Sequence, residues 1–291
     1  MTASIMLTGA TGYLGSHLAQ ALVDGGHRVA VLKRAGSSLA RLAGCIDEIS
    51  CHDLDGDGIA QAFTRQRIDA VVHCAASYGR NGESSLEVFD ANTRFPLQVL
   101  QSATEQGCKL FVNLDTTLPD SLNAYTLSKS QFRQWGHFMA RKTGIRFANA
   151  KLEHFYGPGE PGHSFTARVI AACSRNEPEL PLTKGEQKRD FVYIDDVVQA
   201  LLKILEHGLG TDFQLSEFEI GSGSPVTIRE LVETVHRLTR STTRLAFGAV
   251  PYREGEVMAS NADLTAIRQL GWNAQVALND GLRQSLPRTN D

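Results

Sequence analysis

A glycine-rich turn directly after an apolar strand is the feature that most restricts the fold of this chain. Residues 4–8 are predicted to form a short buried strand, and Gly9, Gly12 and Gly15 follow it at every third position. Apolar residues then recur at helical spacing, at Leu18, Leu22 and Val23. In such a strand–turn–helix unit the glycines permit a tight turn, close approach of a pyrophosphate and close helix packing. We therefore predict an α/β fold, a Rossmann-like doubly wound parallel sheet that binds a dinucleotide.

The start of the predicted helix supplies the binding groups, because its first N–H groups have no partner within the helix and face the phosphates. The residues expected to contact the dinucleotide in this turn are Gly9, Thr11, Gly12, Tyr13, Leu14 and Gly15. The alternative is a tight connection between strand and helix that binds nothing.

Composition and charge exclude several other classes. The chain has 291 residues, 42% of them hydrophobic, and a formal net charge of −3, which gives no reason to expect nucleic acid or an anionic membrane as partner. No apolar run is long enough to cross a bilayer, and the first strand leaves no room for a signal peptide. The five cysteines are scattered and form no C-x-x-C pair, which favours reduced thiols in a cytoplasmic protein. No metal site is expected, since Glu153, His154 and His163 lack a reliable ligand spacing.

The end of the second predicted strand favours one form of the dinucleotide. Residues 28–32 read as a strand, and Lys33 and Arg34 follow it at the place where NAD-binding folds carry an acidic residue for the ribose 2′-hydroxyl. Two cations suit a 2′-phosphate, so NADP(H) is the expected cofactor. The alternative is a solvated basic turn.

A tyrosine and a lysine four residues apart indicate the chemistry. The fifth predicted strand, residues 109–114, is followed by Thr116 and Thr117, and then by Tyr125 and Lys129. On a helix this spacing puts the phenol and the ammonium on one face, one turn apart. We expect the ammonium to lower the pKa of the phenol, which suits Tyr125 for proton transfer, with a threonine hydroxyl orienting the substrate oxygen.

These features together resemble the extended short-chain dehydrogenase/reductases that act on nucleotide sugars, the NAD-dependent epimerase/dehydratase family. The resemblance extends to the segments KLEHFYGPG (151–159), RDFVYIDDV (189–197), YREGE (252–256) and LGW (270–272). There are three departures. Asp115 and Thr116 replace the usual serine pair, the loop from Thr116 to Tyr125 is short, and His154 stands where asparagine is usual.

The resemblance implies roles for further residues. Cofactor contacts are implied for Asp53 and Leu54 at the third strand, for Ala75 and Ala76 at the fourth, and for Tyr125 and Lys129. Substrate contacts are implied for Thr117, His154, Arg189 and Arg253. Asn92 begins a predicted helix, residues 93–103, where it either shapes the site or caps the helix.

The resemblance also implies the organisation of the whole chain. Residues 1–151 are expected to form the NADP-binding domain. Residues 152–291 are expected to form mainly a smaller substrate-binding lobe, with some segments returning to the first domain. A homodimer through a four-helix interface is implied as well.

The reaction follows by comparison within the family. Dehydratases need an Asp-Glu pair directly after the catalytic threonine, and here Thr116 is followed by Thr117 and Leu118. Four-epimerases usually carry an acidic residue where this chain has Lys33. The pattern is therefore most similar to the 4-ketoreductases of nucleotide-diphosphate 4-keto-6-deoxyhexoses, enzymes of deoxysugar and O-antigen synthesis such as the CDP-abequose and CDP-paratose synthases. Tyr125, Lys129 and Thr116 are the expected catalytic residues. A nucleotide-sugar 4-epimerase and a non-catalytic NADP-sensing protein are the alternatives.

Overall fold

The computed structural model describes residues 2–55, 58–211 and 213–287, and the chain divides into two compact units. Unit 1 contains Met1–Leu152, Val198–Glu219 and Ala266–Trp272. Unit 2 contains Glu153–Val197, Ile220–Thr265 and Asn273–Asp291. The chain therefore passes more than once between the units, and each unit is described by itself.

Unit 1 is built on a seven-stranded sheet in the order β11-β6-β5-β4-β1-β2-β3. Its strands are β1 (Ser4–Thr8), β2 (Arg28–Lys33), β3 (Ile49–Asp53), β4 (Ala70–His73), β5 (Leu110–Thr116), β6 (Arg146–Leu152) and β11 (Leu215–Ile220). The pairs from β3 through β6 are all parallel. The chain runs outward from β1 in both directions, so the sheet has a switch point between β1 and β4, where doubly wound folds bind ligands. The predicted Rossmann-like fold is confirmed.

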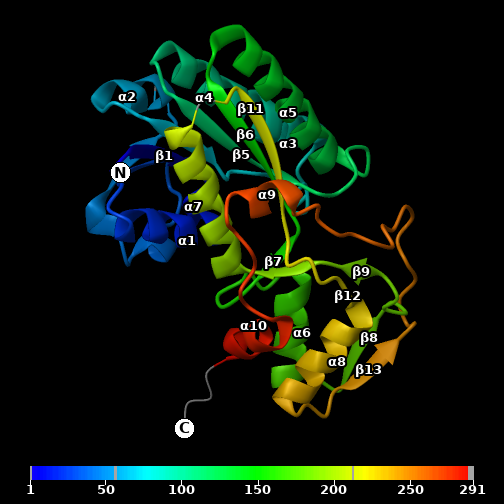
Figure 1. The fold of residues 1–291 in the computed structure, drawn as a ribbon. Coiled ribbons are helices and arrows are strands. Elements are labelled where there is room, and N and C mark those ends of the chain that lie inside the picture. The colour runs from blue at the N-terminus through cyan, green and yellow to red at the C-terminus, as the bar shows by residue number, and fades with distance from the viewer. Residues whose placement is uncertain (1, 56–57, 212, 288–291) are drawn as a thin grey trace. The chain divides into compact units, whose positions relative to one another are not determined.

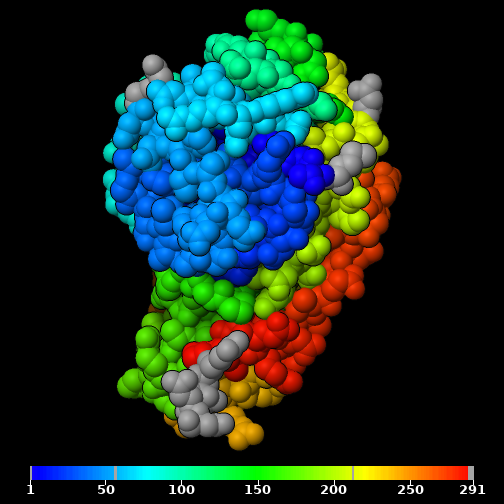
Figure 2. Space-filling view, turned by 90° about the vertical axis from the view of Figure 1, so that its left-hand side faces the viewer, coloured from blue at the N-terminus to red at the C-terminus, as the bar shows by residue number. Residues whose placement is uncertain are grey.

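Helices cover both faces of this sheet. On one side lie α2 (Gly58–Arg65), α4 (Phe95–Glu105) and α5 (Ala124–Thr143), and on the other lie α1 (Tyr13–Asp24) and α7 (Ile194–Gly210) (Figure 1). The core beneath α4 and α5 contains three fully buried aromatic rings, Phe111, Phe132 and Phe147. The segments from α1 to α2 form one continuous surface, dark to light blue in Figure 2, while β1 is buried beneath it. No helix within the described ranges is long and apolar enough to cross a membrane.

The helix that precedes α4 differs from the prediction. A short helix α3 (Ser85–Phe89) begins with a capping box between Ser84 and Glu87, and a π-helical turn, Asp90–Arg94, joins it to α4. Asn92 therefore lies inside a continuous helical segment, and of the two alternatives for this residue the helix cap is wrong. The capping box was the sequence signal for the true start, because Ser84 and Glu87 have the spacing that satisfies two N–H groups.

Unit 2 contains short strands and helices with long connections. Three two-stranded sheets pair β7 (His154–Tyr156) with β10 (Phe191–Tyr193), β9 (Lys188–Arg189) with β12 (Val226–Thr227), and β8 (Glu179–Leu182) with β13 (Arg244–Phe247). Its helices include α6 (Phe165–Ser174), α8 (Ile228–Thr239) and α10 (Leu278–Ser285), while α9 (Thr265–Gln269) falls at the boundary with unit 1. Gly281 of α10 lies directly against Tyr156, since a side chain there would collide with the phenol ring.

Candidate active site

The glycine turn after β1 is shaped by close backbone contacts. Gly9 has a φ of 71°, and a Cβ atom on it would lie 2.5 Å from the backbone nitrogen of Ala75. A Cβ atom on Gly15 would collide with the carbonyl of Gly9. Gly12 donates its N–H to that same carbonyl at 3.0 Å and is itself exposed at the start of α1. The turn is thus an open backbone cradle at a helix N-terminus, which fits a dinucleotide pyrophosphate.

The other residues of this turn have different environments. Tyr13 and Leu14 are buried in the first turn of α1, while Thr11 is half-buried. Ala75 donates its N–H to the hydroxyl of Thr8 at 3.3 Å, and Ala76 is exposed. The structure therefore brings the predicted Gly9 and Ala75 into contact at the switch point of the sheet.

The predicted basic pair at the end of β2 is partly engaged. Lys33 forms an ion pair with Asp53 at the end of β3, and this carboxylate is the main reason that the pKa of Lys33 is raised. Leu54 donates its N–H to the carbonyl of Lys33 at 2.9 Å, which ties the two strand ends together. Arg34 is exposed beside them. A bound 2′-phosphate at this position would therefore meet Arg34 and compete with Asp53 for Lys33.

The tyrosine–lysine pair lies at the start of α5, as predicted. The helix begins at Ala124, one residue before Tyr125, and Asn123 caps it in a capping box with Thr126. Lys129 follows one turn later and is buried. The Thr116 side chain acts to lower the pKa of the Tyr125 phenol, so the end of β5 and the start of α5 adjoin at these two hydroxyl groups.

Thr117 is held differently from its neighbour. Its N–H donates to the carbonyl of Leu152 at 3.3 Å, and its hydroxyl donates to the same carbonyl at 3.4 Å. It is thereby tied to β6, so Thr116 is the threonine that the structure places beside Tyr125. A substrate contact from Thr117 stays a prediction.

The pKa of Tyr125 is shifted in the direction opposite to the one expected from its neighbour Lys129. Burial raises the pKa of Tyr125 well above its usual value, and Tyr78 and the Asp115 carboxylate raise it further. Burial also lowers the pKa of Lys129, against the opposing effect of Asp115. The predicted lowering of the phenol pKa by Lys129 is therefore wrong for this structure, because burial of the phenol is the largest effect on its pKa.

Two residues near Tyr125 were missed by the sequence analysis. The ring of Tyr78 packs against that of Tyr125 with centroids 4.8 Å apart and planes tilted by 35°, and the Arg80 guanidinium lies 5.3 Å from the Tyr78 ring centroid. Both belong to the loop after β4, which no spacing rule connects to α5. Asn92 holds this loop in place, since it bonds to both the N–H and the carbonyl of Ser77 and to the hydroxyl of Ser128.

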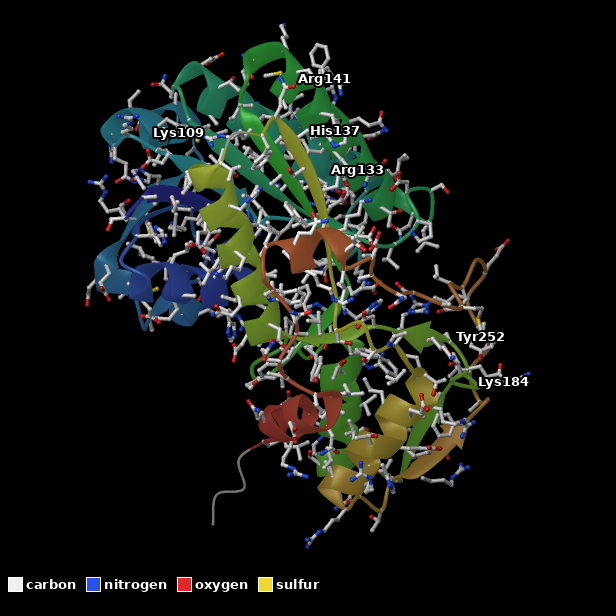
Figure 3. All side chains as sticks on the ribbon, in the orientation of Figure 1. Lys109, Arg133, His137, Arg141, Lys184 and Tyr252 are labelled. Atoms are coloured by element: carbon white, nitrogen blue, oxygen red, sulfur yellow. The ribbon has the colours of Figure 1, made fainter. Side chains whose placement is uncertain are left out.

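A buried polar network lies behind the tyrosine–lysine pair. Asp115 accepts hydrogen bonds from the Thr116 N–H at 2.8 Å, from Arg133 at 2.7 Å and from Asn149 at 3.1 Å. Arg133 projects from α5 near His137 (Figure 3) and also donates to Asp120 at 2.7 Å. Asp115, one of the departures from the family pattern, is thus a fully paired carboxylate adjacent to the predicted catalytic residues.

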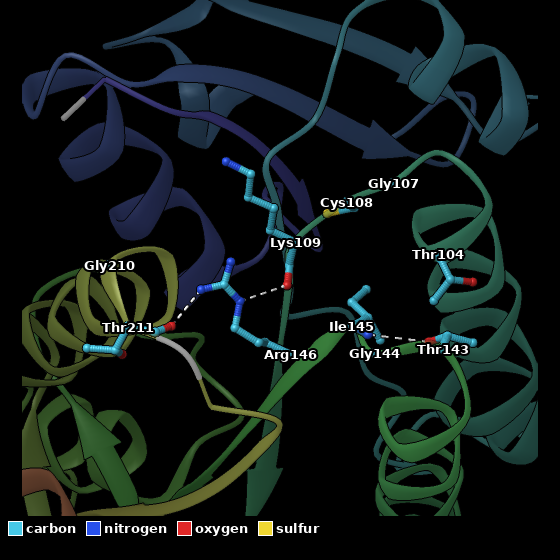
Figure 4. Close-up of a pocket in the computed structure, with 10 residues that line it drawn as sticks. All are labelled: Thr104, Gly107, Cys108, Lys109, Thr143, Gly144, Ile145, Arg146, Gly210 and Thr211. Atoms are coloured by element: carbon cyan, nitrogen blue, oxygen red, sulfur yellow. Dashed lines mark hydrogen bonds between the residues drawn. The ribbon is translucent and has the colours of Figure 1, made fainter.

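A hollow lies at the amino-terminal ends of the sheet strands, and it offers few free polar groups to a ligand. Arg146 and Lys109 lie in it, near the amino ends of β5 and β6 (Figure 4). Arg146 donates to the carbonyl of Thr211 at 2.6 Å and to that of Lys109 at 3.3 Å. Burial raises the pKa of Cys108 in this hollow to about 11, which makes its thiol inert. The guanidinium therefore binds two backbone carbonyls, one directly after α7 and one directly before β5.

The predicted substrate residues outside the first unit lie on separate segments of unit 2. His154 is the first residue of β7, while Arg189 ends β9 and Arg253 is exposed in the loop after β13. The Arg189 guanidinium is buried in an ion pair with Glu256 at 2.6 Å. Among the described residues, no group of three or more His, Cys, Asp or Glu side chains could hold a metal.

The parallel sheet, the glycine cradle and the Tyr125–Thr116–Lys129 arrangement define a dinucleotide-binding protein of the short-chain dehydrogenase/reductase type. Residues 5–216 match the model of the NAD dependent epimerase/dehydratase family, and the chain belongs to that family. The resemblance drawn from the sequence is thereby confirmed.

Several curated proteins are similar to this chain over nearly its whole length. The chain is 30% identical to the CDP-abequose synthase of Salmonella muenchen, over 97% of this chain and 96% of that protein. It is 29% identical to the CDP-abequose synthase of Salmonella typhimurium over 98% and 97%, and 23% identical to the UDP-glucose 4-epimerase of Erwinia amylovora over 97% and 96%.

Solved structures share the fold. The UDP-glucose 4-epimerase of Thermotoga maritima, solved with UDP-glucose, matches with a TM-score of 0.86 at 24% identity, and 97% of each chain is covered. MoeE5 in complex with UDP-glucuronic acid and NAD matches with a TM-score of 0.83, also at 24% identity and 97% coverage of both chains. At this identity the likeness shows the fold alone.

Proposed function

We propose that this protein is an NADPH-dependent reductase of the 4-keto group of a nucleotide-diphosphate 4-keto-6-deoxyhexose, a reaction of deoxysugar synthesis. The observation that carries the proposal is that the Thr116 hydroxyl adjoins the Tyr125 phenol, one turn before buried Lys129. This arrangement offers an acid and a second hydroxyl to one carbonyl oxygen. The similarity to two CDP-abequose synthases supports this substrate class.

The proton transfer follows from the ionisation of Tyr125. When bound, the nicotinamide dinucleotide supplies a hydride to the carbonyl carbon. Tyr125 gives its proton to the carbonyl oxygen as negative charge develops there, and Thr116 orients that oxygen by a hydrogen bond. The raised pKa of Tyr125 keeps the phenol protonated at neutral pH, which is the form that reduction requires. Lys129 supplies a buried positive charge on the same helix face.

The preference for NADPH rests on the end of β2. Lys33 and Arg34 are two cations where NAD-binding folds place a carboxylate. Asp53 weakens the expected preference for NADPH, because its carboxylate already pairs with Lys33. We therefore expect NADPH to be preferred over NADH, with Arg34 as the more available cation.

A homodimer in a reducing compartment completes the proposal. Five large apolar side chains of α3 and α5 are exposed: Leu86, Phe89, Leu127, Trp135 and Phe138. A second copy of the chain would cover this face through the four-helix interface that the family resemblance implies. The five free cysteines fit the cytoplasm, where thiols stay reduced.

The test follows NADPH absorbance with the CDP-, dTDP-, GDP- and UDP-linked 4-keto-6-deoxyglucoses in parallel. At least one is expected to be reduced, faster with NADPH than with NADH. Tyr125→Phe is expected to lower the rate by at least about a hundredfold and to leave NADPH binding intact, because it removes only the proton donor. Tyr193→Phe is the matched control, since its hydroxyl contacts Gln284 in unit 2. Full activity of Tyr125→Phe would remove Tyr125 from its role.

A nucleotide-sugar 4-epimerase is the second candidate, favoured by the similarity to the Erwinia enzyme. Purified protein that carries bound NAD and interconverts UDP-glucose and UDP-galactose without added cofactor would support it. Dinucleotide binding without turnover of any nucleotide sugar would indicate a non-catalytic sensor.

A further inference from the structure

A buried glutamate and a partly exposed histidine adjoin each other at the start of unit 2. Glu153 is 3% exposed, and one of its carboxylate oxygens accepts a hydrogen bond from the Ser260 hydroxyl at 2.5 Å. The other oxygen, Oε2, has no hydrogen-bond partner in the structure and lies 3.6 Å from Nδ1 of His154. That nitrogen is also buried without a hydrogen bond, although the His154 side chain is 41% exposed. The two unsatisfied atoms therefore face each other.

Burial dictates which proton this pair holds. An ionised carboxylate in the interior is costly unless a donor faces it, so Oε2 favours a proton on Nδ1 of His154. The neutral ring with its proton on Nδ1 presents Nε2 as an acceptor, which repels an anion. The imidazolium presents an N–H donor at Nε2 while Nδ1 still donates to Glu153. Since Nδ1 is on the buried edge, the exposed part of the ring is the edge that carries Nε2.

The backbone around the pair is held firmly by neighbouring strands. Glu153 donates its N–H to Ile220 at 2.9 Å, and His154 donates its N–H to the carbonyl of Asp190 at 3.2 Å. The ring of His154 lies 5.9 Å from that of Phe191, its partner in the β7–β10 register. His154 is thereby fixed on a rigid element, as a selective ligand requires.

The other charged groups near the pair are already engaged or set apart. Arg189 attracts Glu153 but is bonded to Glu256 and to the carbonyl of Lys188. The Asp190 carboxylate accepts bonds from Ser222 and Gly223, and Lys188 is exposed on β9. Glu160 follows β7, and burial raises its pKa to about 7. His154 is thus the exposed side chain whose Nε2 becomes a hydrogen-bond donor when the ring takes up a proton.

We infer that Glu153 and His154 form a proton-holding pair whose protonated state binds the diphosphate of the nucleotide sugar, so that substrate affinity falls as pH rises. Glu153 is the positioning residue, and His154 makes the contact. The inference rests on the proposed function for its ligand class. Asparagine, usual at position 154 in the resembled family, binds without a change of charge, so this pH dependence would belong to the present chain.

The experiment measures binding by calorimetry from pH 5.5 to 8.5, with CDP-glucose, dTDP-glucose, UDP-glucose and GDP-glucose as probes. Both phosphates of these probes are esterified and keep one charge state, unlike a phosphate monoester that titrates near pH 6. For the tightest probe we expect the Kd to rise about tenfold per pH unit above the transition, with uptake of up to one proton on binding. Proton uptake is read from the wild-type protein alone, by repeating the titration in buffers of different ionisation enthalpy.

Variants separate the pair from its surroundings. His154→Asn is expected to bind with a Kd that no longer changes with pH, and Glu153→Gln to bind more weakly than the wild type at low pH, because the imidazolium loses its counter-charge and its fixed orientation. Glu160→Gln and His163→Asn are the matched controls, each removing a titratable group from the same lobe, and both should keep the wild-type dependence. A wild-type Kd that is constant across the range, with no proton uptake, would overturn the inference and leave the proposed function standing. Failure of all four probes to bind at any pH would contradict both.

Discussion

Asp115 in unit 1 and Glu153 in unit 2 are both buried carboxylates, but their oxygen atoms are used differently. Asp115 accepts three hydrogen bonds, one of them from a guanidinium. Glu153 accepts one, from a hydroxyl, and leaves an oxygen facing a histidine. Asp115 therefore has a permanent counter-charge in Arg133, whereas the neighbour of Glu153 is a ring that can hold a proton on either nitrogen.

The comparison separates two uses of a buried charge. In unit 1 the carboxylate is part of the framework and acts on the tyrosine–lysine pair at a distance, since it raises the pKa of both Tyr125 and Lys129. In unit 2 the carboxylate acts through one neighbouring ring. Removing a charge should therefore be costly for folding in the first case and mainly alter ligand binding in the second.

The largest effect is expected from Arg133→Met, which breaks the framework pair. The Asp115 carboxylate would stay buried without its cation, which costs about 3–5 kcal/mol of unfolding free energy. Urea denaturation measures it. Arg94→Met is the control, because Arg94 pairs with Asp90 on the surface, where such pairs contribute about 0.5 kcal/mol. If both variants lose the same small amount, Asp115 is not held as the structure indicates.

The next effect is expected from Asp115→Asn and concerns the pH dependence of the reaction. Reduction needs protonated Tyr125, so the rate falls as pH rises through the pKa of that phenol. Asp115 raises this pKa, and removing its charge lowers it, so the fall should occur at lower pH than in the wild type. The profile of kcat/KM against pH measures the change, with the proposed substrate. Asp120→Asn, which alters a more exposed partner of Arg133, should leave the profile in place; a profile unmoved by Asp115→Asn would contradict the electrostatic role.

Glu153→Gln should cost less stability than Arg133→Met in unit 1. Glutamine can still accept the bond from Ser260, and its amide can donate toward Nδ1 of His154, so the loss is about 1 kcal/mol or less. Urea denaturation at pH 7 gives the value directly. A loss as large as that of Arg133→Met would mean that Glu153 is a framework charge like Asp115, and the contrast between the units would disappear.

The fold and part of the site could be predicted because they depend on local patterns. The glycine spacing marked the turn, strand periodicity marked the sheet, and the spacing of Tyr125 and Lys129 marked the helix that carries them. What could not be predicted depends on contacts between distant segments. Tyr78 reaches Tyr125 across 47 positions of sequence, and Arg133 reaches Asp115 from one turn beyond Lys129. The direction of the pKa shift of Tyr125 could not be predicted either, because burial of the phenol decides it and a spacing rule contains no information on burial.

The smallest effect is expected at the solvent edge of the framework network. Lys151 lies 3.4 Å from Glu217, and both side chains are partly exposed, so solvent screens their attraction. Lys151→Met should therefore change the unfolding free energy by about 0.5 kcal/mol or less, and the change should shrink further in 1 M salt. Glu217 also accepts a bond from Asn149, which in turn donates to Asp115. A loss of several kcal/mol would show that the edge and the buried centre act as one cooperative network, which would extend the framework character of unit 1 out to its surface.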